Sequence, residues 1–139
     1  MKRSLVALLM ASAVSTPGVA SNWMPLGEGG DGQFQVFVDL DSVQNNGSRF
    51  TVLEKFSYRT PVKYTGGRLI YAIKSNQSYD CEQRKTLLLH SFAYSDAAAT
   101  VAIESIRYTD NPSNYYAVSA KSFEERVLNL VCPNTIAAR

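Results

Sequence analysis

The sequence is poor in the residues that build most catalytic and metal centres. Its 139 residues include one histidine, two cysteines and one tryptophan. A catalytic triad or a mixed zinc site would each need His90. This histidine lies between Leu88 and Phe92 in an expected strand, so we interpret it as a half-buried strand residue. We therefore expect no catalytic residue, no metal and no cofactor.

The sequence also lacks an excess of charge of either sign. The 14 basic residues outnumber the 12 acidic ones by two, and Lys2 and Arg3 account for the whole difference. From residue 21 onward there are 12 of each sign, so the formal net charge is zero. Without a basic excess, we expect no binding to nucleic acid and none to an anionic membrane surface.

No apolar run is long enough to cross a membrane. The longest, from Leu5 to Val14, has about ten residues, whereas a spanning helix needs about 20. It follows a basic start at residues 2–3 and precedes the small residues Gly18 and Ala20. This order is typical of a secretory signal peptide. We expect residues 1–20 to be removed by cleavage after about Ala20; a buried N-terminal helix is the alternative.

The rest of the chain, residues 21–139, then forms one domain that is periplasmic or secreted. No cysteine lies near the expected cleavage point, so we expect no lipid anchor. Cys81 and Cys132 are too far apart for a CxxC redox motif. In an exported chain such a pair is most simply a disulfide. Closing a loop of roughly 50 residues contributes roughly 4 kcal/mol in the chain-entropy model.

Alternation of apolar and polar residues predicts a series of strands. We expect strands at residues 34–41, 50–58, 69–77, 85–94 and 100–108, with a short one at 115–118. The glycine-rich segment 25–33 is expected to be a loop, and Asn45-Asn46-Gly47 a turn. Glu54 is the exception on the otherwise apolar face of its strand. The strand at 85–94 has apolar residues on both faces, which indicates a central position covered on both sides.

The last part of the chain has the pattern of a helix. Ser122 and Glu125 have the spacing of a capping box. Apolar residues then recur at Phe123, Val127 and Leu130, as on an amphipathic helix, and Pro133 ends the pattern. The expected fold class is α+β: an antiparallel β-meander of five or six strands with one C-terminal helix packed on the sheet and one disulfide.

The candidate binding site is the connection expected at residues 59–68, together with the preceding residue, Tyr58. It offers basic and aromatic side chains and no acid: Tyr58, Arg59, Lys63, Tyr64 and Arg68. Arginine and tyrosine are enriched at interface hot spots, so this loop is a candidate surface for an acidic protein partner. The alternative is an ordinary solvated hairpin connection. A second candidate group for interaction is Tyr108, Tyr115 and Tyr116, which is more simply interpreted as a packing seam under the helix.

Two other patterns offer only weak chemistry. Asp39 and Asp41 lie two apart on the outward face of a strand and could act as an acid–base pair or bind a cation, although such a pair more often ends a strand. The glycines of residues 27–32 lack the lysine and the following helix of a phosphate loop.

The layout resembles the surface-adhesin protein E family of small bacterial envelope proteins. The resemblance rests on Trp23, the run at residues 35–43, Tyr79-Asp-Cys-Glu-Gln-Arg84, Tyr115-Tyr-Ala-Val118, Ser122 and the pair Val131-Cys132. It implies an antiparallel sheet crossed by a C-terminal helix, tied by a Cys81–Cys132 disulfide, and it is compatible with a homodimer. For the named family member it also implies binding of host matrix proteins and plasminogen.

The chain departs from that family in two ways. It has no cysteine for a lipid anchor, which weakens an adhesin role, and its acid-free loop at 59–68 matches no family motif. The leading interpretation is a non-catalytic binding module of the cell envelope whose protein partner is unidentified. Two alternatives remain: a periplasmic accessory or inhibitor protein that binds another envelope protein, and a small hydrolase that uses His90 with Asp39 or Asp41.

The signal peptide gives the first testable prediction. N-terminal sequencing of the protein from a bacterial envelope fraction should begin at Ser21 or within a few residues of it. Recovery of exported protein that still carries Met1 would contradict cleavage.

Overall fold

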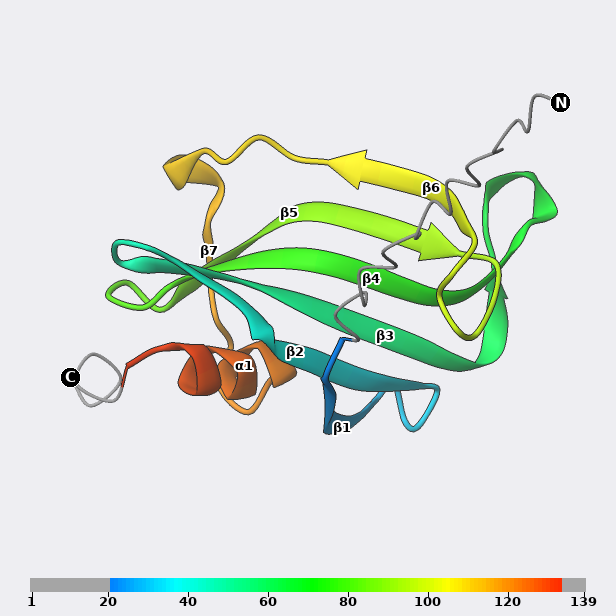
Figure 1. Cartoon of the computed structure of the whole chain (residues 1–139), viewed down its shortest axis with the longest axis horizontal. Coiled ribbons are helices and arrows are strands. Elements are labelled where there is room, and N and C mark those ends of the chain that lie inside the picture. Colours follow the sequence, from blue (N-terminus) through cyan, green and yellow to red (C-terminus); the bar gives the residue numbers. More distant parts are fainter. Residues whose placement is uncertain (1–20, 134–139) are drawn as a thin grey trace, which may run out of the picture.

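The computed structural model describes residues 21–133, so the expected signal peptide lies outside the described residues. Seven strands, two short 3-10 helices and one α-helix follow one another along the chain (Figure 1). They are β1 (Trp23–Gly29), β2 (Phe34–Asn46), β3 (Arg49–Lys63), η1 (Thr65–Gly67), β4 (Leu69–Asp80), β5 (Lys85–Tyr94), β6 (Ala102–Arg107), η2 (Pro112–Asn114), β7 (Tyr116–Ala117) and α1 (Phe123–Val131).

The strands form one antiparallel sheet whose order, β1 to β6, is the order of the chain. Figure 1 shows them succeeding one another from β1 at the bottom to β6 at the top. The two-residue strand β7 pairs with β5. After β6 the chain runs back past the ends of the strands and reaches α1 at the lower left, beside β2. The expected α+β meander with one C-terminal helix is confirmed.

The first strand is a feature that the sequence analysis missed. Residues 25–33 were expected to be a loop, but β1 extends to Gly29 and pairs with β2. Its register shifts between Pro25 and Gly27, and Gly27 has a φ of 132°. Proline and glycine are tolerated in an edge strand at such a bulge. The glycines of this segment therefore shape an irregular edge strand as well as the turn that follows it.

Strand β3 also continues beyond its expected end. It runs to Lys63, with a register shift against β4 between Ser57 and Val62. Half of the loop expected at 59–68 is therefore strand: residues 59–63 belong to β3, and residues 64–68 connect β3 to β4. Bulges of this kind let a strand continue after its alternation is interrupted.

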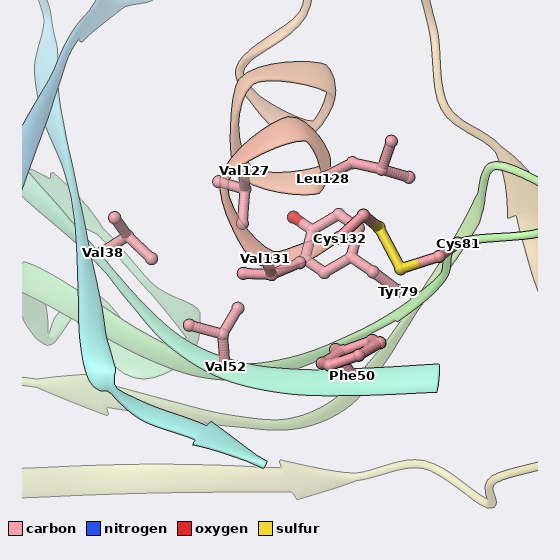
Figure 2. Packing of buried hydrophobic residues seen from close by; sticks show 9 residues of the cluster. All are labelled: Val38, Phe50, Val52, Tyr79, Cys81, Val127, Leu128, Val131 and Cys132. Atoms are coloured by element: carbon pink, nitrogen blue, oxygen red, sulfur yellow. A yellow bond between two sulfur atoms is a disulfide. The ribbon is translucent and has the colours of Figure 1, made fainter. Parts of the chain in front are cut away.

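The main hydrophobic core lies between α1 and one face of the sheet (Figure 2). The helix contributes three buried side chains, Val127, Leu128 and Val131. The sheet contributes four buried side chains beneath them: Val38, Phe50, Val52 and Tyr79. The Cys81–Cys132 disulfide closes this core at the end of the helix, with 5.6 Å between the two Cα atoms.

Three hydrogen bonds fix the start of the helix. Ser122 Oγ accepts a hydrogen bond from the Glu125 amide at 3.1 Å, which confirms the expected N-cap. The Glu125 carboxylate reaches back, but to the amide of Lys121 at 2.8 Å. Arg126 donates to the Leu26 carbonyl of β1 at 2.6 Å. Together these contacts hold the N-terminal turn of α1 beside the first strands.

The β5 strand is covered on both faces near its start, as its sequence predicted. The side chains of Thr86 and Leu87 project to opposite faces, and both residues are buried. Tyr115 is also buried, and its hydroxyl lies 2.8 Å from Ser78 Oγ. The three tyrosines expected to pack together under the helix do not share one environment: Tyr115 is buried, whereas Tyr108 and Tyr116 are exposed.

Among the described residues no helix is long and apolar enough to cross a membrane.

The disulfide gives the second prediction. Because Cys81 and Cys132 are 51 residues apart, Cys81→Ser, Cys132→Ser and the double variant should each lose about 4 kcal/mol of unfolding free energy. Urea denaturation measures this loss. Wild-type protein reduced with dithiothreitol is the matched control and should resemble the double variant; equal stability of the oxidised and reduced forms would contradict the prediction.

Candidate functional site

A pocket of about 410 Å³ opens on the helix face of the sheet, beside the N-terminal turn of α1. Strands β3, β4 and β5 form its floor, and β2, β7 and α1 supply its walls. The lining residues are Phe34, Glu54, Phe56, Tyr58, Ile73, Ser75, Gln77, Leu88, Ser91, Tyr116, Phe123 and Glu124. We call this site the helix-side pocket. Its size and its mixture of apolar walls with a few polar groups are typical of ligand sites.

Glu54 is the buried acid of this pocket. It lies in the middle of β3, where Val38 of β2 and Ser75 of β4 are its register partners. Only 2% of Glu54 is exposed. Its carboxyl accepts a hydrogen bond from the hydroxyl of Tyr79, the buried tyrosine of the core. The acid is therefore held in place by a partner that is itself almost fully enclosed.

Burial raises the pKa of Glu54 to about 7, because the charged form loses its hydration. The hydrogen bond from Tyr79 opposes this by stabilising the carboxylate, and the nearby Glu124 raises the pKa further. Burial and the Glu54 charge also raise the pKa of Tyr79, so this tyrosine remains a hydrogen-bond donor. Glu54 therefore changes its charge near neutral pH, a property that is common among residues of functional sites.

Aromatic rings surround the approach to this acid. Phe56 contacts both Phe34 and Phe123 edge to face, with ring centroids 5.8 and 5.3 Å apart. Tyr58 extends the row, 6.0 Å from Phe34. On the other side Tyr116 is 51% exposed and accepts a hydrogen bond from Gln77 at 3.4 Å. We call Phe34, Phe56, Tyr58, Phe123 and Tyr116 the aromatic rim.

This arrangement favours a cationic or amine-bearing group. Aromatic faces attract cations, especially where water is displaced. The carboxyl groups of Glu54 and Glu124 both line the pocket, and an entering positive charge would stabilise their ionised forms. Among residues 21–133 no group of three or more His, Cys, Asp and Glu side chains is arranged to hold a metal ion.

The five residues expected to form one basic binding loop are divided by the structure. Arg59 forms an ion pair with Glu28 of β1. Tyr64 donates to Glu104 of β6 at 2.7 Å, and Arg68 approaches the same carboxylate at 3.5 Å. The segment itself contains no acid, but two of its three basic residues, Arg59 and Arg68, are paired with acids of other strands. Sequence alone could not reveal these pairs, because both acids come from distant strands.

These residues still line surface features. Tyr58 and Arg59, with neighbouring residues 60–62 and the turn at 31–33, line a hollow of about 430 Å³. Lys63 is exposed near the end of β3. Exposed ion pairs such as Arg59–Glu28 contribute little stability, so a partner could displace them. The binding role of this segment stays a prediction.

The residues considered for hydrolytic chemistry do not come together. Asp39 and His90 lie on β2 and β5, three strand spacings or about 14 Å apart. The ring of His90 contacts that of Phe92 in a tilted arrangement, with 4.0 Å between centroids. Asp39 was expected on the outward face of its strand but is buried, and it accepts a hydrogen bond from the Asp41 amide within β2 at 3.1 Å. This geometry provides no acid–base pair between His90 and either aspartate.

The helix-side pocket was not recognised from the sequence, although one signal was present. Glu54 interrupts an apolar strand face, and a buried acid is rare unless it has a partner. The partner, Tyr79, is 25 residues away in the chain, and only the β3–β4 register brings the two together.

These features define a class: a small disulfide-linked domain with an antiparallel meander, a C-terminal helix on one face and a pocket beside that helix. The sequence model of the family described as surface-adhesin protein E matches residues 23–133. The chain therefore belongs to the surface-adhesin protein E family, which suggests a surface adhesin-like binding protein. No protein with a curated description matches it.

The buried acid gives the third prediction. The folded pKa of Glu54, about 7, exceeds its ordinary value of 4.5, so folding favours the protonated form. The contribution of Glu54 protonation to the unfolding free energy is fully present below pH 4.5 and is lost as the pH rises through about 7. The unfolding free energy of Glu54→Gln relative to wild type should therefore rise by about 3 kcal/mol between pH 4 and pH 8.

Urea denaturation of both proteins across this pH range measures the difference. Other titrating groups cancel in the comparison, and glutamine can still accept the Tyr79 hydrogen bond. Parallel stability profiles for the two proteins would show that Glu54 has an ordinary pKa.

Proposed function

We propose that this protein is a non-catalytic binding module of the bacterial cell envelope, and that it binds a protein partner through the helix-side pocket. The observation that carries the proposal is the buried Glu54 carboxyl beneath an aromatic rim that is open to solvent. Membership of the surface-adhesin protein E family supports a binding role. A signal peptide at residues 1–20 would deliver the domain to the periplasm or beyond.

The chemistry of the pocket favours a lysine or arginine side chain of the partner. The aromatic rim would contact its aliphatic stem, and its charge would approach Glu54 and Glu124. Because Glu54 has a pKa of about 7, binding of a cation would be coupled to loss of a proton. Affinity should therefore fall by roughly tenfold per pH unit below pH 7.

Two kinds of partner fit this proposal. The family name favours a host protein, such as the matrix proteins and plasminogen that the family resemblance implies. The alternative is another envelope protein, for which this domain would be an accessory or inhibitor. Antibody labelling of intact cells separates the two, because only a protein displayed on the surface is accessible to a host. A hydrolase is disfavoured by the separation of His90 from Asp39.

The fourth prediction tests the pocket with small probes. Nα-acetyl-lysine amide and Nα-acetyl-arginine amide should shift the NMR signals of Phe56, Tyr116 and Phe123. Nα-acetyl-norleucine amide, which lacks the charge, should bind at least tenfold more weakly. Glu54→Gln should reduce lysine binding and remove its pH dependence, because the charge that titrates is gone.

Tyr116→Ser should also weaken binding, whereas Tyr108→Ser is the matched control. Both tyrosines are about half exposed, at 51% and 47%, and only Tyr116 lines the pocket. A pull-down from envelope extract with the same variants extends the test to the natural partner. A triple variant, Arg59→Ala/Lys63→Ala/Arg68→Ala, tests the other candidate surface. If this variant loses the partner while Glu54→Gln keeps it, the partner binds at residues 58–68 instead of the helix-side pocket.

A further inference from the structure

The opposite face of the sheet carries a second cluster, built from five strands. Its members are Trp23 of β1, Phe37 of β2, Lys55 of β3, Lys74 of β4 and Tyr94 of β5, and we call them the lysine–aromatic face. Side chains alternate between the two faces of a strand. Glu54 faces α1, so Lys55 points away from it, and the register places Phe37 and Lys74 beside Lys55.

The two lysines are direct cross-strand partners. Like charges opposite each other in an antiparallel pair are destabilising. Lys55 Nζ lies 4.9 Å from the ring centroid of Trp23 and 4.6 Å from that of Phe37. Lys74 Nζ lies 6.0 Å from the Trp23 centroid and 5.0 Å from that of Tyr94. Each ammonium group is thus held between aromatic rings, and Trp23 is common to both.

No carboxylate neutralises this pair within the part of the chain that the structure describes. The ion pairs found there involve other cations, and all of them are arginines. Lys74 donates a hydrogen bond to the Ala99 carbonyl at 3.1 Å, an interaction that leaves its charge uncompensated. Burial and the Lys74 charge lower the pKa of Lys55. A bound anion would offset the repulsion between the two lysines, because its negative charge stabilises both ammonium groups.

We propose that the lysine–aromatic face binds an acidic segment of a protein partner, with a carboxylate placed between Lys55 and Lys74. This site is separate from the helix-side pocket and does not depend on its role. Charge complementarity requires an anion, and the three aromatic side chains provide the apolar contact area that is typical of protein interfaces. A sulfated polysaccharide is a less suitable ligand, because such polymers bind best to long rows of basic residues. The lysine–aromatic face has only one pair of lysines, in a domain without net charge.

Trp23 makes the site directly observable, because it is the only tryptophan of the chain. Addition of poly-L-glutamate at pH 7 and low salt should change its fluorescence in a saturable manner. The affinity should fall as salt is raised, since salt screens the attraction between the half-buried lysines and the carboxylates of the polymer. Lys55→Met and Lys74→Met should each weaken binding at least tenfold, and calorimetric titration provides a readout independent of the tryptophan.

Lys121→Met removes an exposed lysine outside the cluster and should leave the affinity within twofold. A variant with both Lys55→Arg and Lys74→Arg keeps the charges and should retain binding, which separates loss of charge from loss of fold. Failure of poly-L-glutamate to bind, or equal loss in Lys121→Met, would overturn the proposal. Binding of heparin without poly-L-glutamate would also overturn it, in favour of a sulfated polysaccharide.

Discussion

The disulfide between Cys81 and Cys132 holds the end of α1 against the sheet. The position of the helix, and with it the helix-side pocket, depends on this covalent link. A helix of nine residues is too short to be stable alone in water. It is fixed by the disulfide at one end, by its cap and Arg126 at the other, and by three buried side chains between them. The first turn of α1 then forms a wall of the helix-side pocket, where Phe123 meets Phe56.

The same anchoring explains how an acid can remain in the core. Burial of Glu54 is costly unless it is protonated or hydrogen-bonded, and Tyr79 supplies the hydrogen bond from a position under the helix. A leucine at this position would avoid the cost. An acid that lowers stability at this position is consistent with the binding role proposed above, because sites that bind ligands often sacrifice stability.

Local patterns in the sequence predicted much of the fold, because alternation and capping act over a few residues. The β5 strand and the Ser122 cap are examples, whereas the disulfide was expected because an exported chain with only two cysteines most simply pairs them. The β1 strand could not be recognised, since its proline and glycines are tolerated only because β2 lies beside them. The ion pairs of the segment 59–68 could not be predicted for a related reason: Glu28 and Glu104 reach its arginines from the two edge strands of the sheet. Spatial neighbours of this kind depend on register, which composition does not reveal.

Register also gives the two faces of the sheet their opposite chemistry. Glu54 and Lys55 are consecutive residues of β3, so they project to opposite sides. On β4 the partners of these two residues are Ser75 and Lys74, and the alternation repeats there. A slip of one residue would move each set to the wrong face, and Val38 and Val52 would leave the core. The packing beneath α1 therefore fixes the position of Glu54 on one face and, through the same strands, the lysine pair on the other.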